Sequence, residues 1–179
     1  YCLGQMQAEN ATNVLVSVLE DRCQEPMVRH EAAEALGALG YESNILILEK
    51  FKTDPIVEVA ETCQLAIDRI KWLNEAETNK LSTNPYNSID PAPPFTSIDV
   101  NQLKNILINE KESLFDRYRA MFALRNINSK QSVEALGQAL KYGSALFKHE
   151  IAFVLGQMQN KLSVPFLIES LEDSNENEM

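Results

Sequence analysis

A short pattern that recurs along the chain constrains its fold more than any other feature. The pattern is seen in "YCLGQMQ" at 1–7, "EALGALG" at 34–40, "MFALRNI" at 121–127 and "FVLGQMQ" at 153–159. The first two copies are 33 residues apart, measured from Gly4 to Gly37. A period of this length is typical of solenoids, in which each helical hairpin buries its apolar face against its neighbours.

The segments between these copies are also amphipathic. Apolar residues recur at three- and four-residue spacing in "ATNVLVSVLED", "NILILEKF", "NQLKNILI" and "SVPFLIESLED". The sequence has no run of alternating β-branched residues and no Asn-Gly or Asp-Gly turn. Pro26, Pro55 and Pro165 lie near predicted helix starts, and Ser129 or Asn128 is expected to cap the helix of "QSVEALGQAL". The sequence therefore predicts an all-α fold, an α-solenoid of HEAT-like helical hairpin repeats.

A proline-rich segment divides the chain into two halves. We predict an N-terminal half at 1–74, a linker at 75–98 with four of the seven prolines, and a C-terminal half at 99–179. The halves are pseudo-symmetric. Moving residues 1–27 by 152 positions lays "LGQMQ" on "LGQMQ" and Met27 on Met179.

Only two histidines occur, and each is followed directly by glutamate. They are His30 in "VRHEAAEALGALG" and His149 in "KHEIAFVLGQMQ". Glutamate makes up 19 of 179 residues, so both pairings would arise by chance about once in a hundred. Inheritance within the repeat is the alternative explanation, but the other repeats place Val59 and Arg117 where a histidine would stand. The His-Glu pair is kept although these positions have diverged, and this favours a function for the pair.

The repeat also predicts that the chain is an internal fragment. By the 152-residue offset, a counterpart of His149 and Glu150 would stand just before Tyr1. By the 33-residue period, a further pair would begin near position 182. We therefore expect a parent protein with four His-Glu motifs, of which the outer two lie a few residues outside this sequence.

Imidazole and carboxylate together are the ligands of non-haem iron, zinc or manganese sites. Histidines on neighbouring helices about 8–10 Å apart can reach one ion from both sides. Four motifs would hold two ions in the cleft between the halves, and metal pairs are a recurrent catalytic design. The sequence has no HExxH, no Glu-x-x-His, no glycine-rich phosphate loop and no GxSxG elbow, although a Ser-His-Asp arrangement stays open.

Composition narrows the classes of partner. A net charge of −10 and a pI near 4.7 argue against nucleic-acid binding and favour a cationic partner. No apolar run approaches the roughly 20 residues that span a bilayer, and no signal peptide is seen, so we predict a cytoplasmic protein without a membrane partner. Cys2, Cys23 and Cys63 form no CxxC pair and are expected to be buried free thiols.

The motifs resemble those of the deoxyhypusine hydroxylase family, HEAT-repeat di-iron monooxygenases with four His-Glu motifs in two halves. The two His-Glu segments, "YCLGQMQ" and the linker "NPYNSIDPAPP" carry the resemblance, which covers the whole chain. It implies a pair of irons that activates O2 to hydroxylate deoxyhypusine, a modified lysine of eukaryotic translation initiation factor 5A, to hypusine. The protein partner would be that factor.

The resemblance also implies roles for individual residues. His30 and Glu31 would bind one iron, and His149 and Glu150 would be the metal residues of the other, where Glu150 would also be the substrate-facing carboxylate. Further substrate-binding positions would be Gly4, Met27, Gly156 and Met179. The alternatives are that these glycines allow close helix packing, that these methionines fill the core, and that the two glutamates are solvated helix charges.

With two of four motifs, the chain carries half of the expected ligands, so we expect the fragment itself to be inactive. Two rival functions are considered. A non-enzymatic HEAT scaffold would bind a partner helix in its groove and would not depend on His30 or His149. A HEAT-like lyase that attaches bilin chromophores would share the fold but would not need repeated His-Glu pairs.

Overall fold

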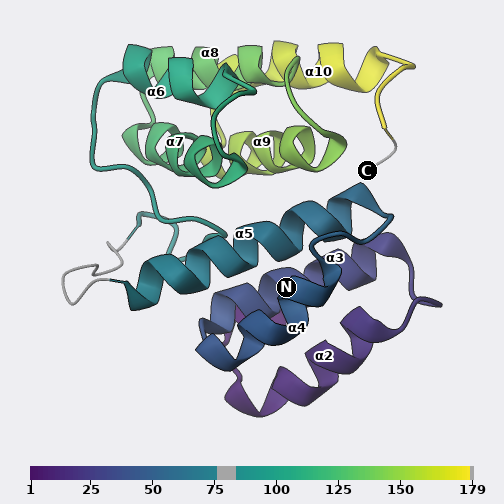
Figure 1. Ribbon diagram of the computed structural model, residues 1–179. Helices are drawn as coiled ribbons and strands as arrows, with labels where there is room; N and C mark the ends of the chain where they lie inside the picture. Colours follow the sequence, from purple (N-terminus) through teal and green to yellow (C-terminus); the bar gives the residue numbers. More distant parts are fainter. Residues whose placement is uncertain (76–83, 178–179) are drawn as a thin grey trace. The chain divides into compact units, whose positions relative to one another are not determined.

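The computed structural model describes residues 1–75 and 84–177 (Figure 1). Their helical elements are α1 (Cys2–Gln5), η1 (Glu9–Ala11), α2 (Thr12–Glu20), α3 (Pro26–Leu39), η2 (Glu42–Asn44), α4 (Ile45–Phe51), α5 (Val57–Asn74), α6 (Val100–Ile108), α7 (Leu114–Ile127), α8 (Lys130–Ala139), α9 (Ala145–Met158), η3 (Lys161–Ser163) and α10 (Val164–Glu172). No strand occurs in the two described ranges, so the all-α prediction is confirmed. No helix in these ranges is long and apolar enough to cross a membrane.

The chain forms two compact units, unit 1 from Tyr1–Thr83 with Asn87–Ala92 and unit 2 from Asn84–Tyr86 with Pro93–Met179. In unit 1, α3 packs between α1 and α5, while α2 packs on α3 and α4 packs on α5. In unit 2, α7 and α9 form one row of helices and α6, α8 and α10 form the other (Figure 1). The linker predicted at 75–98 stays a prediction, and its residues 76–83 lie outside the described part.

The helix bounds reproduce the predicted repeat. The short helices η1 and η2 begin at Glu9 and Glu42, 33 residues apart. An offset of 88 carries α2 onto α6 and α3 onto α7, and an offset of 119 carries α3 onto α9, at both ends of each helix. The predicted offset of 152 carries η1 onto η3 and α2 onto α10. The HEAT-like repeat is therefore confirmed, and the ends of these helices match to the residue.

The same bounds correct one sequence alignment. His30 and His149 are each the fifth residue of a 14-residue helix, and the fifth residue of the matching helix α7 is Tyr118. Arg117 was therefore placed wrongly, and it matches Arg29 instead. Each guanidinium group donates from Nε to a carbonyl oxygen ten residues earlier, at 2.9 Å from Arg117 and at 3.0 Å from Arg29. The alignment of Val59 with His30 stays a prediction, because α5 begins two residues before a 33-residue offset from α3 would start it and so does not fix this register.

The predicted helix signals lie where the helices begin. Pro26 is the first residue of α3, and Pro165 lies in the first turn of α10. Ser129 is the N-cap of α8, where its side chain and that of Ser132 form a capping box. Asn128 instead ends α7 in the left-handed conformation with φ 47°. The expected cap of α8 is thus Ser129, and Asn128 belongs to the helix before it.

Helices α3 and α5 approach each other unusually closely at Gly37. A Cβ atom added at Gly37 would lie 2.7 Å from Ala66 Cβ and 2.9 Å from Ala66 Cα. Around this contact Leu36, Ile67 and Ile70 are fully buried. Only glycine fits at this crossing, and the crossing holds α5 against the face of α3 that carries His30.

Part of the predicted linker, residues 87–92, is fastened to unit 1. The Gln5 side-chain amide donates to Ile89 O and accepts from Ile89 N, both at 2.8 Å. The buried Arg69 donates from Nε to Asp90 O at 3.0 Å and from Nη1 to Gly37 O at 2.7 Å. Residues 87–92 are therefore held by side chains of α1 and α5.

Gly37 and Gly156 occupy the same position in α3 and α9, so they form a matched pair for mutation. Gly37→Ala should lower the free energy of unfolding by about 1–3 kcal/mol, because the new methyl group overlaps Ala66. Gly156→Ala should leave it unchanged or raise it by up to about 1 kcal/mol, because nothing lies within 4 Å and alanine favours the helix. Urea unfolding of the chain, followed by circular dichroism, measures both changes, and equal effects would contradict the close crossing.

Candidate metal centre

The His30 side chain is enclosed between α3 and α5, and the residue is only 1% exposed. Its Nδ1 lies 3.0 Å from Oγ1 of Thr62, which is on α5. Its Nε2 lies on the other side of the ring, 3.8 Å from Oε1 of Glu31. Two ligand atoms that are each about 2.1 Å from one metal ion stand roughly 3–4 Å apart. The neighbouring imidazole and carboxylate therefore fit two positions around a single ion.

Glu31 is partly exposed, and its second carboxylate oxygen faces α1. Oε2 lies 3.0 Å from the amino nitrogen of Tyr1, the residue before α1. Within residues 1–75 and 84–177, no three side chains of His, Cys, Asp or Glu gather into a group that could hold a metal. His30 and Glu31 thus provide a pair of donors, and a complete coordination shell would need further ligands.

The second His-Glu pair lies on α9, in the other unit. His149 is partly buried and lines a cavity of about 630 Å³ bounded by α9, α10 and the residues after α10, with Ala145, Ala152 and Leu167 also at its wall. Glu150 is only 8% exposed. The environment of His149 therefore differs from that of His30, because its ring borders an open space.

The other predicted site residues have different surroundings. Gly4 is buried, and a Cβ atom there would lie 2.9 Å from Cα of Ala35, so the position permits close packing of α1 on α3. Gly156 has nothing within 4 Å of its added Cβ among the described atoms. Met27 is 37% exposed near the start of α3, so it is not a core residue. Met179 lies outside the described residues, and the substrate-binding roles of these positions stay predictions.

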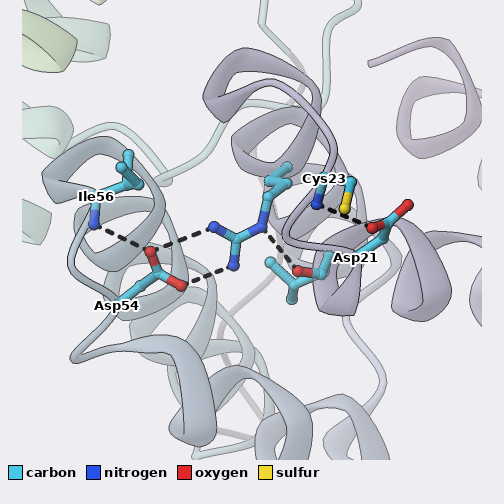
Figure 2. A network of polar contacts seen from close by, with 6 residues as sticks. Asp21, Cys23, Asp54 and Ile56 are labelled. Atoms are coloured by element: carbon cyan, nitrogen blue, oxygen red, sulfur yellow. Dashed lines mark hydrogen bonds and ion pairs between the residues drawn. The ribbon is translucent and has the colours of Figure 1, made fainter.

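An arginine directly before His30 anchors the start of α3, which sequence reasoning missed. Arg29 Nη2 and Nη1 donate to the two Asp54 carboxylate oxygens at 2.7 and 3.3 Å, and both side chains are almost completely buried. Figure 2 shows Asp54 facing this guanidinium group and also the Ile56 backbone N–H, which donates to it at 3.0 Å. The Arg29 hydrogen bonds hold the pKa of Asp54 below its usual value. They fix α3 to the loop before α5.

The other His-Glu pair is preceded by a basic residue as well. Lys148 Nζ donates to both carboxylate oxygens of Glu176 at 2.8 and 2.9 Å. This pair is about a quarter exposed, unlike the buried pair of unit 1. The basic residue of each contact can be read from the sequence, in "RHE" and "KHE". The acidic partner cannot, because it lies 25 residues away in one case and 28 in the other, without a fixed spacing.

Glu34 is a further carboxylate near the site that sequence reasoning missed. It follows Glu31 by three residues on α3, within "HEAAE". Burial raises the pKa of Glu34 to about 7, and the neighbouring charge of Glu31 adds to the rise. Its carboxyl group is therefore only partly ionised at neutral pH.

The cysteines are free, but only one of them is buried. Burial raises the pKa of Cys63 to about 12, so its thiol stays protonated. Cys2 and Cys23 are exposed, so the prediction of burial was wrong for these two. They lie at the beginning of α1 and in the loop before α3, where few apolar residues can cover them.

Comparison with known proteins identifies both the repeat and the relatives of the chain. A family model described as PBS lyase HEAT-like repeat matches residues 28–54 and 116–142. Deoxyhypusine hydroxylase of Drosophila melanogaster is 56% identical and that of Rattus norvegicus 52% identical, each over the whole chain and 59% of the relative. A structure of human deoxyhypusine hydroxylase in complex with glycerol matches with a TM-score of 0.95 at 51% identity, over 99% of this chain and 61% of that one.

The stacked helical hairpins, with a His-Glu pair on one helix of each unit, and the match to a HEAT-like repeat model define a HEAT-repeat protein. More particularly, the chain is similar over its whole length to deoxyhypusine hydroxylases, as its motifs predicted. It spans about 59% of the length of the curated relatives it matches. Whole-chain similarity to hydroxylases favours that family over the scaffold and the bilin lyase considered from sequence.

The Arg29–Asp54 pair makes a prediction about pH. Asp54→Asn should lower the free energy of unfolding at pH 7 by about 3 kcal/mol, because it leaves a buried guanidinium group without its counter-charge. Because the folded state lowers the pKa of Asp54, the pair stabilises the protein above the usual pKa near 3.8 and loses this effect as pH falls through the lower, folded-state value. The difference between wild type and variant should therefore shrink on acidification.

Urea unfolding at pH 7 and at about pH 3, followed by the fluorescence of the single tryptophan, Trp72 of α5, measures this difference in unit 1. Lys148→Met is the matched control, because its partly exposed pair should contribute no more than about 1 kcal/mol. An Asp54→Asn loss that is the same at both pH values would contradict the electrostatic explanation.

Proposed function

We propose that the whole protein that contains this sequence is a deoxyhypusine hydroxylase of the cytoplasm. It would be an iron-dependent monooxygenase that uses O2 to hydroxylate the deoxyhypusine side chain of eukaryotic translation initiation factor 5A. One observation carries the proposal: a His-Glu pair occupies the fifth and sixth positions of two 14-residue helices, one in each unit. Two other helices of the repeat, α5 and α7, have lost the pair, so repetition alone does not account for it.

In this proposal His30 and Glu31 are ligands of one iron. The remaining ligands would come from sequence outside residues 1–179. By the 152-residue offset, the counterpart of the α9 pair would stand one helical turn before Tyr1, and α1 packs on α3. The Tyr1 nitrogen lies 3.0 Å from Glu31, so that turn would begin beside the existing donors.

His149 would bind the second iron, and Glu150 would hold the cationic amines of the substrate. Bound iron supplies the redox chemistry by which dioxygen is activated. The protein side chains orient the substrate and supply negative charge for it. The net charge of −10 attracts a polyamine-like side chain, and a carboxylate as buried as Glu150 binds a cation more strongly than one in water.

The 179-residue chain alone is not expected to hydroxylate, because metal affinity falls steeply when ligands are missing. A non-enzymatic scaffold remains the competing function. It requires neither histidine, whereas the hydroxylase requires both, so mutation of the histidines separates the two.

The test compares the full-length protein with its His30→Ala/His149→Ala variant. We expect about two irons per chain in the wild-type protein. In the variant we expect marked loss of iron and a fall of roughly 100-fold or more in hydroxylation of the deoxyhypusine-bearing factor. Metal analysis and a product assay measure these quantities after aerobic purification.

The matched control replaces two exposed glutamates at equivalent repeat positions, Glu20→Ala/Glu172→Ala, and should keep its iron. A folded wild-type protein that takes up no iron, even after reconstitution, would refute the iron-dependent hydroxylase. A double-histidine variant that keeps iron and activity would refute the assignment of ligands.

A further inference from the structure

The hydrogen bonds around His30 determine which ring nitrogen carries its proton. His30 Nδ1 lies 3.0 Å from Thr62 Oγ1. The same hydroxyl oxygen lies 2.8 Å from the carbonyl oxygen of Glu58, one turn earlier on α5. Thr62 therefore stands between a ring nitrogen and a backbone carbonyl group.

A threonine hydroxyl group has one proton to donate, and a carbonyl oxygen can only accept. The 2.8 Å contact with Glu58 O requires that proton, because two oxygens at this distance without a hydrogen between them repel. Towards His30 the hydroxyl oxygen is then an acceptor, so Nδ1 must carry a hydrogen. In a neutral imidazole this leaves the lone pair on Nε2.

We propose that Thr62 is a positioning residue that fixes His30 in the Nδ1–H tautomer and so makes Nε2 the metal-binding atom. This inference rests on the proposed function. Nε2 is the ring atom that faces Oε1 of Glu31, at 3.8 Å. Metal-binding histidines generally donate their other N–H to a fixed acceptor, which sets the ring orientation as well as the tautomer.

The packing of α3 and α5 holds this acceptor in place. Thr62 lies one helical turn before Ala66, the residue in contact with Gly37, on the face of α5 that meets α3. Both His30 and Thr62 are almost completely buried, so water does not compete for the hydrogen bond. A hydroxyl group that bonds to its own helix backbone is also restricted in rotation, and it keeps its lone pair directed at the ring.

The experiment uses the full-length protein with 15N-labelled histidine, first free of metal and then titrated with Fe(II). Nitrogen chemical shifts distinguish the two tautomers, and His30→Gln identifies the His30 signals. In the wild-type protein we expect the Nδ1–H tautomer. Thr62→Val removes the acceptor at nearly constant size, and it should give mixed or reversed tautomers and lower the iron affinity by about 10–100-fold.

Thr62→Ser keeps the hydroxyl group and should retain both the tautomer and the affinity to within about threefold. Thr12→Val is the matched control, because Thr12 Oγ1 makes the same kind of bond, to Glu9 O at 2.9 Å, on an exposed helix end. A purely structural role for Thr62 would change stability without changing the tautomer. If Thr62→Val does not fold, the wild-type spectrum and Thr62→Ser decide the question.

An Nε2–H tautomer in the metal-free wild-type protein would overturn the inference, and so would an unchanged tautomer and iron affinity in folded Thr62→Val. If the wild-type protein binds iron and hydroxylates its substrate, either result leaves the proposed function unaffected. A wild-type protein that binds no iron overturns the proposed function and, with it, any metal-positioning role, whichever tautomer is seen.

Discussion

The close crossing of α3 and α5 is the contact on which the candidate site of unit 1 depends. The absence of a side chain at Gly37 brings the α3 backbone against Ala66, and this approach places Thr62 within 3.0 Å of the His30 ring. Close-packed interiors transmit small displacements because they contain little free space. A shift of one helix by the width of a methyl group would therefore separate the imidazole from its acceptor.

Charge secures the same helix at its other end. The buried Arg29 side chain joins the last residues of α2, through Leu19 O, to the loop before α5, through Asp54. Arg117 repeats the contact with α6 in unit 2, but position 142, which matches Asp54, is a tyrosine. Arg117 instead stacks on the Phe147 ring, with its guanidinium carbon 3.9 Å from the ring centre. The repeat thus keeps the arginine and changes its second partner.

Periodicity was sufficient to predict the helical hairpins, because a 33-residue repeat leaves few ways to bury the apolar faces. It also singled out His30 and His149 as candidate ligands, since both chemistry and position recur. It did not give the register of the diverged repeats. The sequence placed Arg117 where a histidine would stand in α7, and the helix bounds shift that position to Tyr118. The contact of Thr62 with His30 could not be found from sequence, because a hydroxyl group inside a helix carries no motif and meets its partner only when another helix packs against it.

The paired hydrogen bonds between Gln5 and Ile89 have a consequence for how unit 1 assembles. Most packing in this unit joins elements that are neighbours in the repeat, so the entropy lost on closing each intervening loop is small. The Gln5–Ile89 contact closes a loop of 84 residues, and it requires α1 and the residues after α5 to be already in place. We expect it to form late in folding, after the hairpins have stacked. Residues 87–92 would then stabilise the completed unit and would not act as a nucleus for its folding.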